Sequence, residues 1–172
     1  MFINLNNNLS IKKLDINDNK DIWLINTLDQ DEKVAGKNGF LYSIKEKIQK
    51  DYQLNRNSLY GNHYAVYLKK EEPIGYLKIT KICEVEQSVY LDYALIKEKR
   101  GHGYMITTLI GVSNLIFKDK ENDVEEIILK IDSLNKGSQR TADLAGFKKG
   151  RKKFGRYTYT LTKSLHTKRV QN

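Results

Sequence analysis

Cysteine, proline and long apolar runs are scarce in this sequence, and each scarcity excludes a class of protein. Cys83 is the only cysteine, so the chain has no internal disulfide and no thiolate cluster for zinc, which favours the cytosol. No apolar run approaches the roughly 18 residues that span a bilayer, and residues 1–9 are too rich in asparagine for a signal peptide. The three histidines lack metal-ligand spacing. We therefore expect a cytoplasmic protein that neither enters a membrane nor holds a metal.

The composition indicates one globular domain. Of the 172 residues 40% are hydrophobic, and the aromatic content, with Pro73 as the only proline, argues against a disordered chain. We expect a single domain over residues 1–163, followed by a basic, flexible tail over residues 164–172.

The positive charge is concentrated late in the chain. The net charge is +9, and residues 97–172 carry seventeen Lys and Arg against eight Asp and Glu. An anionic molecule is expected to approach this part of the chain, whether a phosphorylated cofactor, a nucleic acid or an acidic protein.

The spacing of apolar residues predicts a mixed α/β fold. Two early helices are indicated, the second by Phe40, Leu41, Ile44 and Ile48, and from residue 61 the period changes to two. The predicted order is strand 10–14, helix 21–28, helix 40–51, strands 63–68, 74–82 and 89–96, helix 103–117, strand 127–131, helix 135–145, and strands 147–154 and 156–162.

The predicted strand over residues 89–96 is apolar on both faces, which is typical of a strand in the middle of a sheet. Asp92 is an acid within it, and burial would raise the pKa of its carboxyl group. Asp92 is therefore the best candidate for a general base, with Tyr93 and Glu86 as weaker ones. A structural acid, or one that attracts a cationic amine without taking its proton, fits the sequence equally well.

A glycine-rich turn separates this strand from the following helix. It reads Arg100-Gly101-His102-Gly103-Tyr104-Met105. Two glycines let consecutive backbone N–H groups point into one concavity at a helix N-terminus, a geometry that binds phosphate. Arg100, Lys97 and Lys99 add formal charge. A plain turn between strand and helix would also explain the glycines.

A second segment makes the turn more specific. After the next predicted strand, the chain reads Asn135-Lys136-Gly137-Ser138, and the helix that follows ends at Gly146-Phe147. Together the two segments resemble the GCN5-related N-acetyltransferases, in particular the branch of the RimJ/RimL ribosomal-protein acetyltransferases. The looser resemblance covers Ser10 to Lys163, and the sharp motifs cover residues 89–147.

The resemblance implies a fold, a cofactor and a set of site residues. The fold would be a mixed, mostly antiparallel sheet of six to seven strands with about four helices, and acetyl-CoA would be the co-substrate. Backbone groups near Leu95, Ile96 and Lys97 would hold the pantetheine arm, and the turn from Arg100 to Met105 would hold the pyrophosphate. Ser138 would lie beside the sulfur, where its hydroxyl could hydrogen-bond or protonate the leaving thiolate, and Asn135 would contact the arm. From the residues alone, Ser138 and Asn135 could equally serve the start of the helix.

The sequence departs from the family pattern at three positions. Met105 replaces Gly or Ala, as it often does in this branch, and Lys97 replaces the proline that usually follows the central strand. Ala142 stands where many members carry a tyrosine that protonates the thiolate. Tyrosine-acid chemistry from position 142 is therefore excluded.

The acceptor implied is a primary amine. A protein N-terminal α-amine, with an ordinary pKa near 8, loses its proton more readily than lysine, and net positive charge suits an acidic partner. A small amine, such as an aminoglycoside or a polyamine, is the close alternative. The other classes kept open are a protein that binds CoA without catalysis and a nucleic-acid-binding module. A homodimer is compatible with the sequence, which carries no signal for oligomeric state.

A basic cluster near the C-terminus bears on the nucleic-acid alternative. It contains no acid and consists of Lys148, Lys149, Arg151, Lys152, Lys153 and Arg156. Interleaved aromatic residues would suit RNA, but we favour an exposed strand whose charges resist edge pairing.

Overall fold

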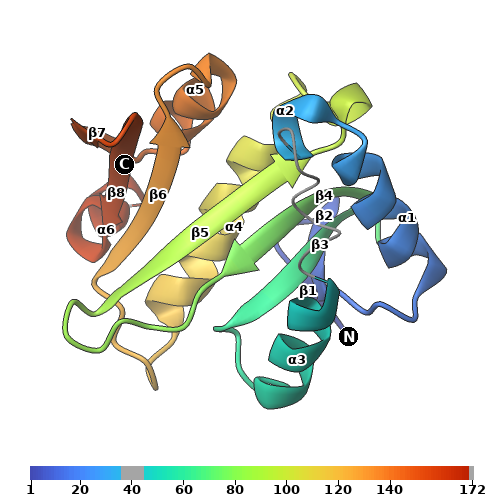
Figure 1. The fold of residues 1–172 in the computed structure, drawn as a ribbon. Helices are drawn as coiled ribbons and strands as arrows, with labels where there is room; N and C mark the ends of the chain where they lie inside the picture. The colour runs from blue at the N-terminus through green and yellow to red at the C-terminus, as the bar shows by residue number, and fades with distance from the viewer. Residues whose placement is uncertain (36–44, 171–172) are drawn as a thin grey trace.

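The structure, a computed structural model, describes residues 1–35 and 45–170, and these form a sheet flanked by helices (Figure 1). The strands are β1 (Phe2–Asn4), β2 (Leu9–Lys13), β3 (Asn62–Leu68), β4 (Glu72–Ile79), β5 (Ser88–Leu95), β6 (Glu126–Asp132), β7 (Lys148–Lys153) and β8 (Arg156–Thr162). The helices are α1 (Asn19–Asp29), α2 (Glu32–Ala35), α3 (Lys45–Leu54), α4 (Tyr104–Lys118), α5 (Lys136–Leu144) and α6 (Lys163–Val170), and a short 3₁₀ helix, η3, covers Lys97–Lys99.

The strands form one sheet in the order β1-β2-β3-β4-β5-β6-β8-β7. All neighbouring strands are antiparallel except β5 and β6, which are parallel. Because parallel strands need a crossover connection, α4 carries the chain from the end of β5 back to the start of β6. The strand predicted at residues 89–96 is therefore β5, in the middle of the sheet as expected.

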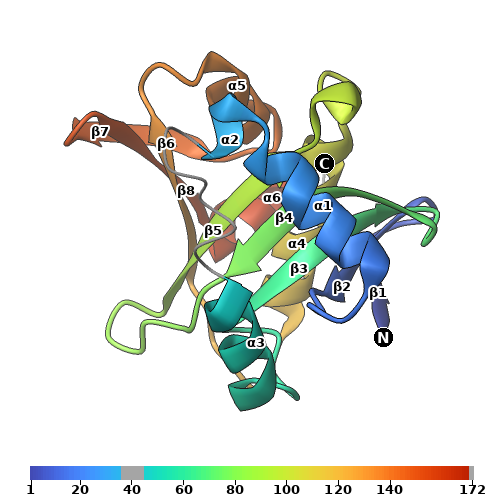
Figure 2. The same ribbon diagram turned by 45° about the vertical axis from the view of Figure 1, so that its right-hand side comes forward.

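Helices cover both faces of the sheet (Figures 1 and 2). On one face, α1 and α3 pack on the sheet through a cluster that includes Leu24, Leu28 and Ile48. On the other face, α4 contributes Leu109, Val112 and Ile116 to the larger cluster. The alternation of side chains along the strands supplies apolar residues to both clusters.

Most predicted elements are confirmed within one or two residues at each end, but the described residues contain eight strands where six to seven were expected. The additional strand is β1, which has only three residues in an asparagine-rich segment and pairs with β2. The short helix α2 was also missed. Phe40, Leu41 and Ile44, on which the second predicted helix partly rested, lie outside the described residues, whereas Ile48 is buried in α3.

The structure describes residues up to 170 of the flexible tail that the sequence predicts over residues 164–172. They form α6, in which the His166 ring packs against Phe117 with centroids 5.1 Å apart, and Nε2 of His166 lies 2.7 Å from Oδ1 of Asn114. Leu165 packs against the core. In the sequence, the few residues of α6 that contact the rest of the protein are separated by polar residues. The sequence pattern therefore resembles that of an unstructured tail.

The basic cluster lies on β7 and at the start of β8. All six residues of β7 are exposed, and β7 is the edge strand of the sheet. The exposed, charged edge is the arrangement that the sequence favoured, and Figure 2 shows β7 extending away from the helices.

Candidate active site

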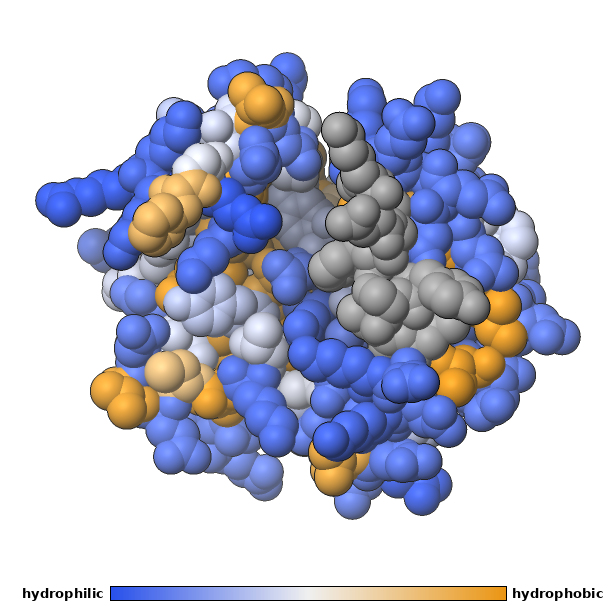
Figure 3. Space-filling view, viewed as in Figure 1, coloured by the Kyte–Doolittle hydropathy of each residue, from blue (hydrophilic) through white to orange (hydrophobic). Residues whose placement is uncertain are grey.

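β5 and β6 run together and then separate. Their register begins at the pair Ser88–Glu126 and ends at Tyr90–Ile128, and no later pair follows in the described residues, although β5 continues to Leu95. Figure 1 shows the two strands diverging toward α5, and in the same view the molecular surface is hollowed where they diverge (Figure 3). The later part of β5 is therefore not paired with β6 in the described residues, and a gap opens between two strands in the middle of the sheet.

The glycine-rich turn lies at the end of β5, where this gap opens. Gly101 and Gly103 have φ values of 80° and 78°, which side chains rarely permit, and a Cβ atom added to either would meet nothing within 4 Å. Gly103 is the N-cap of α4, and no side chain caps the helix. The first-turn N–H groups of α4 thus lack a side-chain partner beside open space, and the helix dipole makes this end positive. This is a site suited to phosphate oxygens.

Arg100 ties the turn to its surroundings. Its Nε and one terminal nitrogen lie 3.1 and 2.9 Å from the backbone oxygen of Leu95, and it forms an ion pair with Asp31 after α1. The guanidinium in this structure therefore holds the end of β5 in place. Of its neighbours, Lys99 pairs with Glu72 at 2.8 Å, and Lys97 is exposed.

The remaining predicted cofactor residues surround the same turn. The N–H of Ile96 donates to the backbone oxygen of Ile74 at 3.1 Å, so this donor is already used. The rings of His102 and Tyr104 stack with centroids 5.8 Å apart, and Met105 is buried at the start of α4. The structure thus brings the predicted residues from Leu95 to Met105 into one continuous corner.

Gly75, which was not among the predicted site residues, faces this corner from β4. It pairs with Leu95, and a Cβ atom at Gly75 would lie 2.5 Å from the backbone oxygen of Ala94 and 2.6 Å from Cδ2 of Leu95. Both contacts are too close for any side chain. Gly75 is therefore required for β4 to approach the end of β5.

The start of α5 lies across the gap. Asn135 is its N-cap, and the Oδ1 atom accepts from the N–H of Ser138 at 3.0 Å, so the capping role predicted for Asn135 is confirmed. The helix ends before Gly146, whose φ is 96°, as the sequence indicated. The hydroxyl of Tyr93, on β5, donates to the backbone oxygen of Ser138 at 3.1 Å. Tyr93 therefore bridges the two walls of the gap.

Asp92 does not have the environment that the sequence predicted. The residue is exposed, and Lys78 lies opposite it on β4. The expectation that Asp92 is buried is therefore wrong, because alternation along a strand assigns a face and does not say whether that face is covered. Asp92 and Tyr93 are adjacent on β5 and point to opposite faces, so Asp92 and Ser138 are not brought together.

A polar network on the Asp92 face was missed by sequence reasoning. His63 is 4% exposed, its Nδ1 lies 2.8 Å from the Tyr76 hydroxyl, and its Nε2 lies 3.0 Å from Oδ2 of Asp51. Burial lowers the pKa of His63 and raises that of Tyr76, which the charges of Asp92 and Asp51 raise further. The available signal was a histidine inside an otherwise apolar strand.

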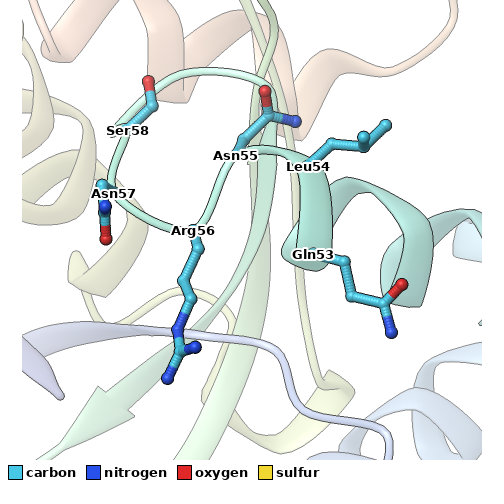
Figure 4. Close-up of a pocket in the computed structure, with 6 residues that line it drawn as sticks. All are labelled: Gln53, Leu54, Asn55, Arg56, Asn57 and Ser58. Atoms are coloured by element: carbon cyan, nitrogen blue, oxygen red, sulfur yellow. The ribbon is translucent and has the colours of Figure 1, made fainter.

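The other features of the described residues add no competing site. A cavity of about 470 Å³ at the end of α3 is lined by Gln53, Leu54, Asn55, Arg56, Asn57 and Ser58 (Figure 4), and its only ionisable side chain is that of Arg56. Residues 1–35 and 45–170 contain no cluster of three or more His, Cys, Asp or Glu that could hold a metal. None of the described helices is long and apolar enough to cross a bilayer.

The family model for the acetyltransferase (GNAT) domain matches residues 9–148, which is most of the chain. This chain is a member of the GNAT acetyltransferase family. The resemblance inferred from the two motifs is thereby confirmed, and the enzyme is an N-acetyltransferase with acetyl-CoA as its co-substrate. The uncapped amides beside two open glycines, and the gap between β5 and β6, are features into which the pyrophosphate and the arm of that molecule fit.

Solved structures confirm the fold of this acetyltransferase. It is similar to the aminoglycoside acetyltransferase AAC(6')-Ib in complex with ribostamycin and coenzyme A (17% identity, 96% of this chain and 98% of that one, TM-score 0.76). It is also similar to a chimera of the spermidine N-acetyltransferase SpeG of Vibrio cholerae and hSSAT (15%, 93% and 98%, 0.73). RimL, a ribosomal-protein α-N-acetyltransferase in complex with coenzyme A, matches as well (18%, 94% and 98%, 0.66). No curated protein matches the chain.

Proposed function

We propose that this GNAT enzyme transfers the acetyl group of acetyl-CoA to a primary amine, with a protein N-terminal α-amine as its preferred acceptor. The observation that carries the proposal is the combination of the open glycine turn at α4 with the gap between β5 and β6. The turn offers backbone donors to the pyrophosphate, and the part of β5 that is not paired with β6 would offer backbone hydrogen bonds to the amide groups of the arm. Acetyl-CoA supplies an activated acyl group as a thioester.

The residues around the gap divide the remaining work between the two faces of the sheet. On the α5 side, Ser138 would place its hydroxyl beside the sulfur and hydrogen-bond the thiolate as it leaves. On the opposite side, Asp92 would attract the incoming cationic amine. Because Asp92 is exposed, we assign it this electrostatic role. It would take part in proton transfer only by passing the amine proton on to water.

The preference for an α-amine follows from the acid–base chemistry of the acceptor. An α-amine is appreciably deprotonated at neutral pH, whereas a lysine amine, with an ordinary pKa near 10.4, is almost wholly protonated. An enzyme whose candidate base, Asp92, is exposed is better suited to the easier acceptor. The excess positive charge, including the exposed β7 edge, would attract an acidic protein.

A small polycationic amine is the second candidate, and one observation favours it. The negative charges of Asp51 and Asp92 both act on the hydroxyl of Tyr76, so two carboxylates lie near one point on the acceptor face. Such a local acidic field attracts polyamines or aminoglycosides despite the net charge of the molecule. Among the structural neighbours, both kinds of enzyme occur.

A thiol-release assay with acetyl-CoA separates these candidates. Peptides with free N-termini, the same peptides with blocked N-termini, spermidine and kanamycin would be the acceptors. We expect release with the free peptides and little with the blocked ones. Release with spermidine or kanamycin but not with the peptides would instead support a small polycationic amine as the acceptor. Acetyl-CoA binding in calorimetry without release in any arm would indicate a protein that binds CoA without catalysis, and salt-sensitive RNA binding without acetyl-CoA binding would indicate a nucleic-acid module.

A further inference from the structure

The family's usual thiolate acid has no counterpart on α5 of this chain. Ala142 occupies that position and is completely buried. A leaving thiolate still needs hydrogen-bond donors, and Ser138 carries the only hydroxyl in the first turn of α5. A further hydrogen-bond donor could reach the first turn of α5 from another strand or helix.

The hydroxyl of Tyr93 reaches the first turn of α5 from β5. Its contact with the backbone oxygen of Ser138 spans the gap, at 3.1 Å. Tyr93 lies beyond Tyr90–Ile128, the last paired position of β5 and β6. At Tyr93, β5 is therefore not paired with β6. Because the residue stands on the opposite face to Asp92, its hydroxyl lies on the side of the sheet away from the proposed approach of the amine.

A second buried hydroxyl lies in the core cluster against which Tyr93 packs. Tyr159, on β8, is 0% exposed, and its hydroxyl has no hydrogen-bond partner among the described residues. Burial, and to a smaller extent a negative charge on Tyr159, raises the pKa of Tyr93. Buried polar groups without a partner are rare in folded proteins. An unpaired hydroxyl in this cluster is therefore consistent with a place that a polar ligand atom occupies.

We propose that, when acetyl-CoA is bound, the Tyr93 hydroxyl turns its single proton from the backbone oxygen of Ser138 to the CoA sulfur and, together with the Ser138 hydroxyl, stabilises the thiolate as it departs. This inference rests on the proposed acetyl transfer. As the amine nitrogen forms its bond to the carbonyl carbon, the C–S bond breaks and its electron pair goes to sulfur. The proton that the nitrogen loses passes to solvent, and the thiolate takes a proton from solvent on release.

The energetics favour hydrogen bonding over proton transfer from Tyr93. Burial raises the pKa of Tyr93 to about 12. An ordinary thiol has a pKa of about 8.5, so the phenol is the weaker acid and keeps its proton. A protonated phenol remains a full donor to a developing negative charge, and such charge-assisted bonds are stronger than neutral ones.

The test replaces Tyr93 with phenylalanine, which removes one oxygen atom and keeps the ring. Tyr90→Phe is the matched control, because Tyr90 is on the same strand within the registered part. The thiol pKa of coenzyme A bound to each variant would be measured from thiolate absorbance, with calorimetry of acetyl-CoA binding alongside. For Tyr93→Phe we expect this pKa to rise by about 1 to 2, with binding of acetyl-CoA nearly unchanged. Tyr90→Phe should match the unmodified enzyme.

Turnover with the acceptor found by thiol release provides the kinetic counterpart. Tyr93→Phe should lower kcat by about 10- to 100-fold and leave KM for acetyl-CoA nearly unchanged, because the bond strengthens only as charge develops on sulfur. If a folded Tyr93→Phe variant has an unchanged thiol pKa and an unchanged kcat, the role proposed for Tyr93 is overturned and the proposed acetyl transfer is not. Failure of the unmodified enzyme to bind acetyl-CoA would instead overturn the proposed function.

A second measurement tests the inference even if the Tyr93→Phe variant does not fold. Fluorotyrosine placed only at position 93 reports on the hydroxyl through its fluorine NMR resonance. We expect the resonance to move on binding of coenzyme A and to move less on binding of desulfo-coenzyme A. Equal movement with both ligands would show that the hydroxyl does not sense the sulfur, and would overturn the inference.

Discussion

Substitution of Gly103 by aspartate should abolish acetyl-CoA binding while the protein remains folded. Gly103 has a φ of 78° and open space around its Cβ position, so aspartate meets no clash and costs only the backbone strain, about 1–2 kcal/mol. An aspartate at this N-cap would place its carboxylate among the first-turn amides of α4, where the pyrophosphate is proposed to bind.

The expected loss of affinity follows from Coulomb's law. Two unit charges about 4 Å apart repel by about 4 kcal/mol at an effective dielectric constant of about 20, which is about a thousandfold in Kd. Calorimetry with acetyl-CoA measures the affinity, and circular dichroism with urea unfolding verifies the fold.

Gly155→Asp is the matched control. Gly155 has a φ of 76° and nothing within 4 Å of an added Cβ atom, and it lies in the turn between β7 and β8. Aspartate at position 155 therefore causes the same backbone strain and the same change of charge as aspartate at position 103, but away from the glycine turn. We expect Gly155→Asp to lose similar stability and to bind acetyl-CoA normally. Equal affinity in both variants would refute the assignment of the turn.

The remaining predictions concern three other residues. Ser138→Ala should lower turnover by roughly ten- to a thousandfold with little change in acetyl-CoA affinity, measured by steady-state kinetics and calorimetry; equal turnover would leave Ser138 a purely structural residue of α5. Gly75→Ala should destabilise the fold by about 1–3 kcal/mol in urea unfolding, because its methyl group would overlap the backbone oxygen of Ala94, and an unchanged midpoint would contradict the close approach of β4 and β5. Burial lowers the pKa of His63, so the folded state binds fewer protons than the unfolded state, and stability from this residue is lost as pH falls below about 6.5, by at most about 1.4 kcal/mol per pH unit. His63→Gln should lack that dependence, and parallel stability curves for the two proteins between pH 7.5 and 5.5 would argue against it.

The elements around the glycine turn could be predicted because they are continuous in the chain. The strand, the glycine turn and the start of α4 follow one another directly, so local spacing identifies them. The Asn135 cap and the helix end at Gly146 are likewise local features, and both are present as predicted.

The acceptor side could not be predicted in the same way, because it depends on contacts between distant segments. His63 meets Tyr76 from the neighbouring strand and Asp51 from α3, and no local pattern joins the three. Asp92 was expected to be buried since its strand neighbours are apolar, but burial depends on what covers the face. Tyr93 was considered only as a base, because its contact with α5 arises from the divergence of two strands.

A crystal structure of the enzyme with acetyl-CoA would test the central claim most directly. We predict that the pyrophosphate oxygens accept hydrogen bonds from the backbone N–H groups of the turn from Gly101 to Met105, with the arm between β5 and β6. A structure in which acetyl-CoA is bound elsewhere, and the turn contacts no phosphate, would contradict the account.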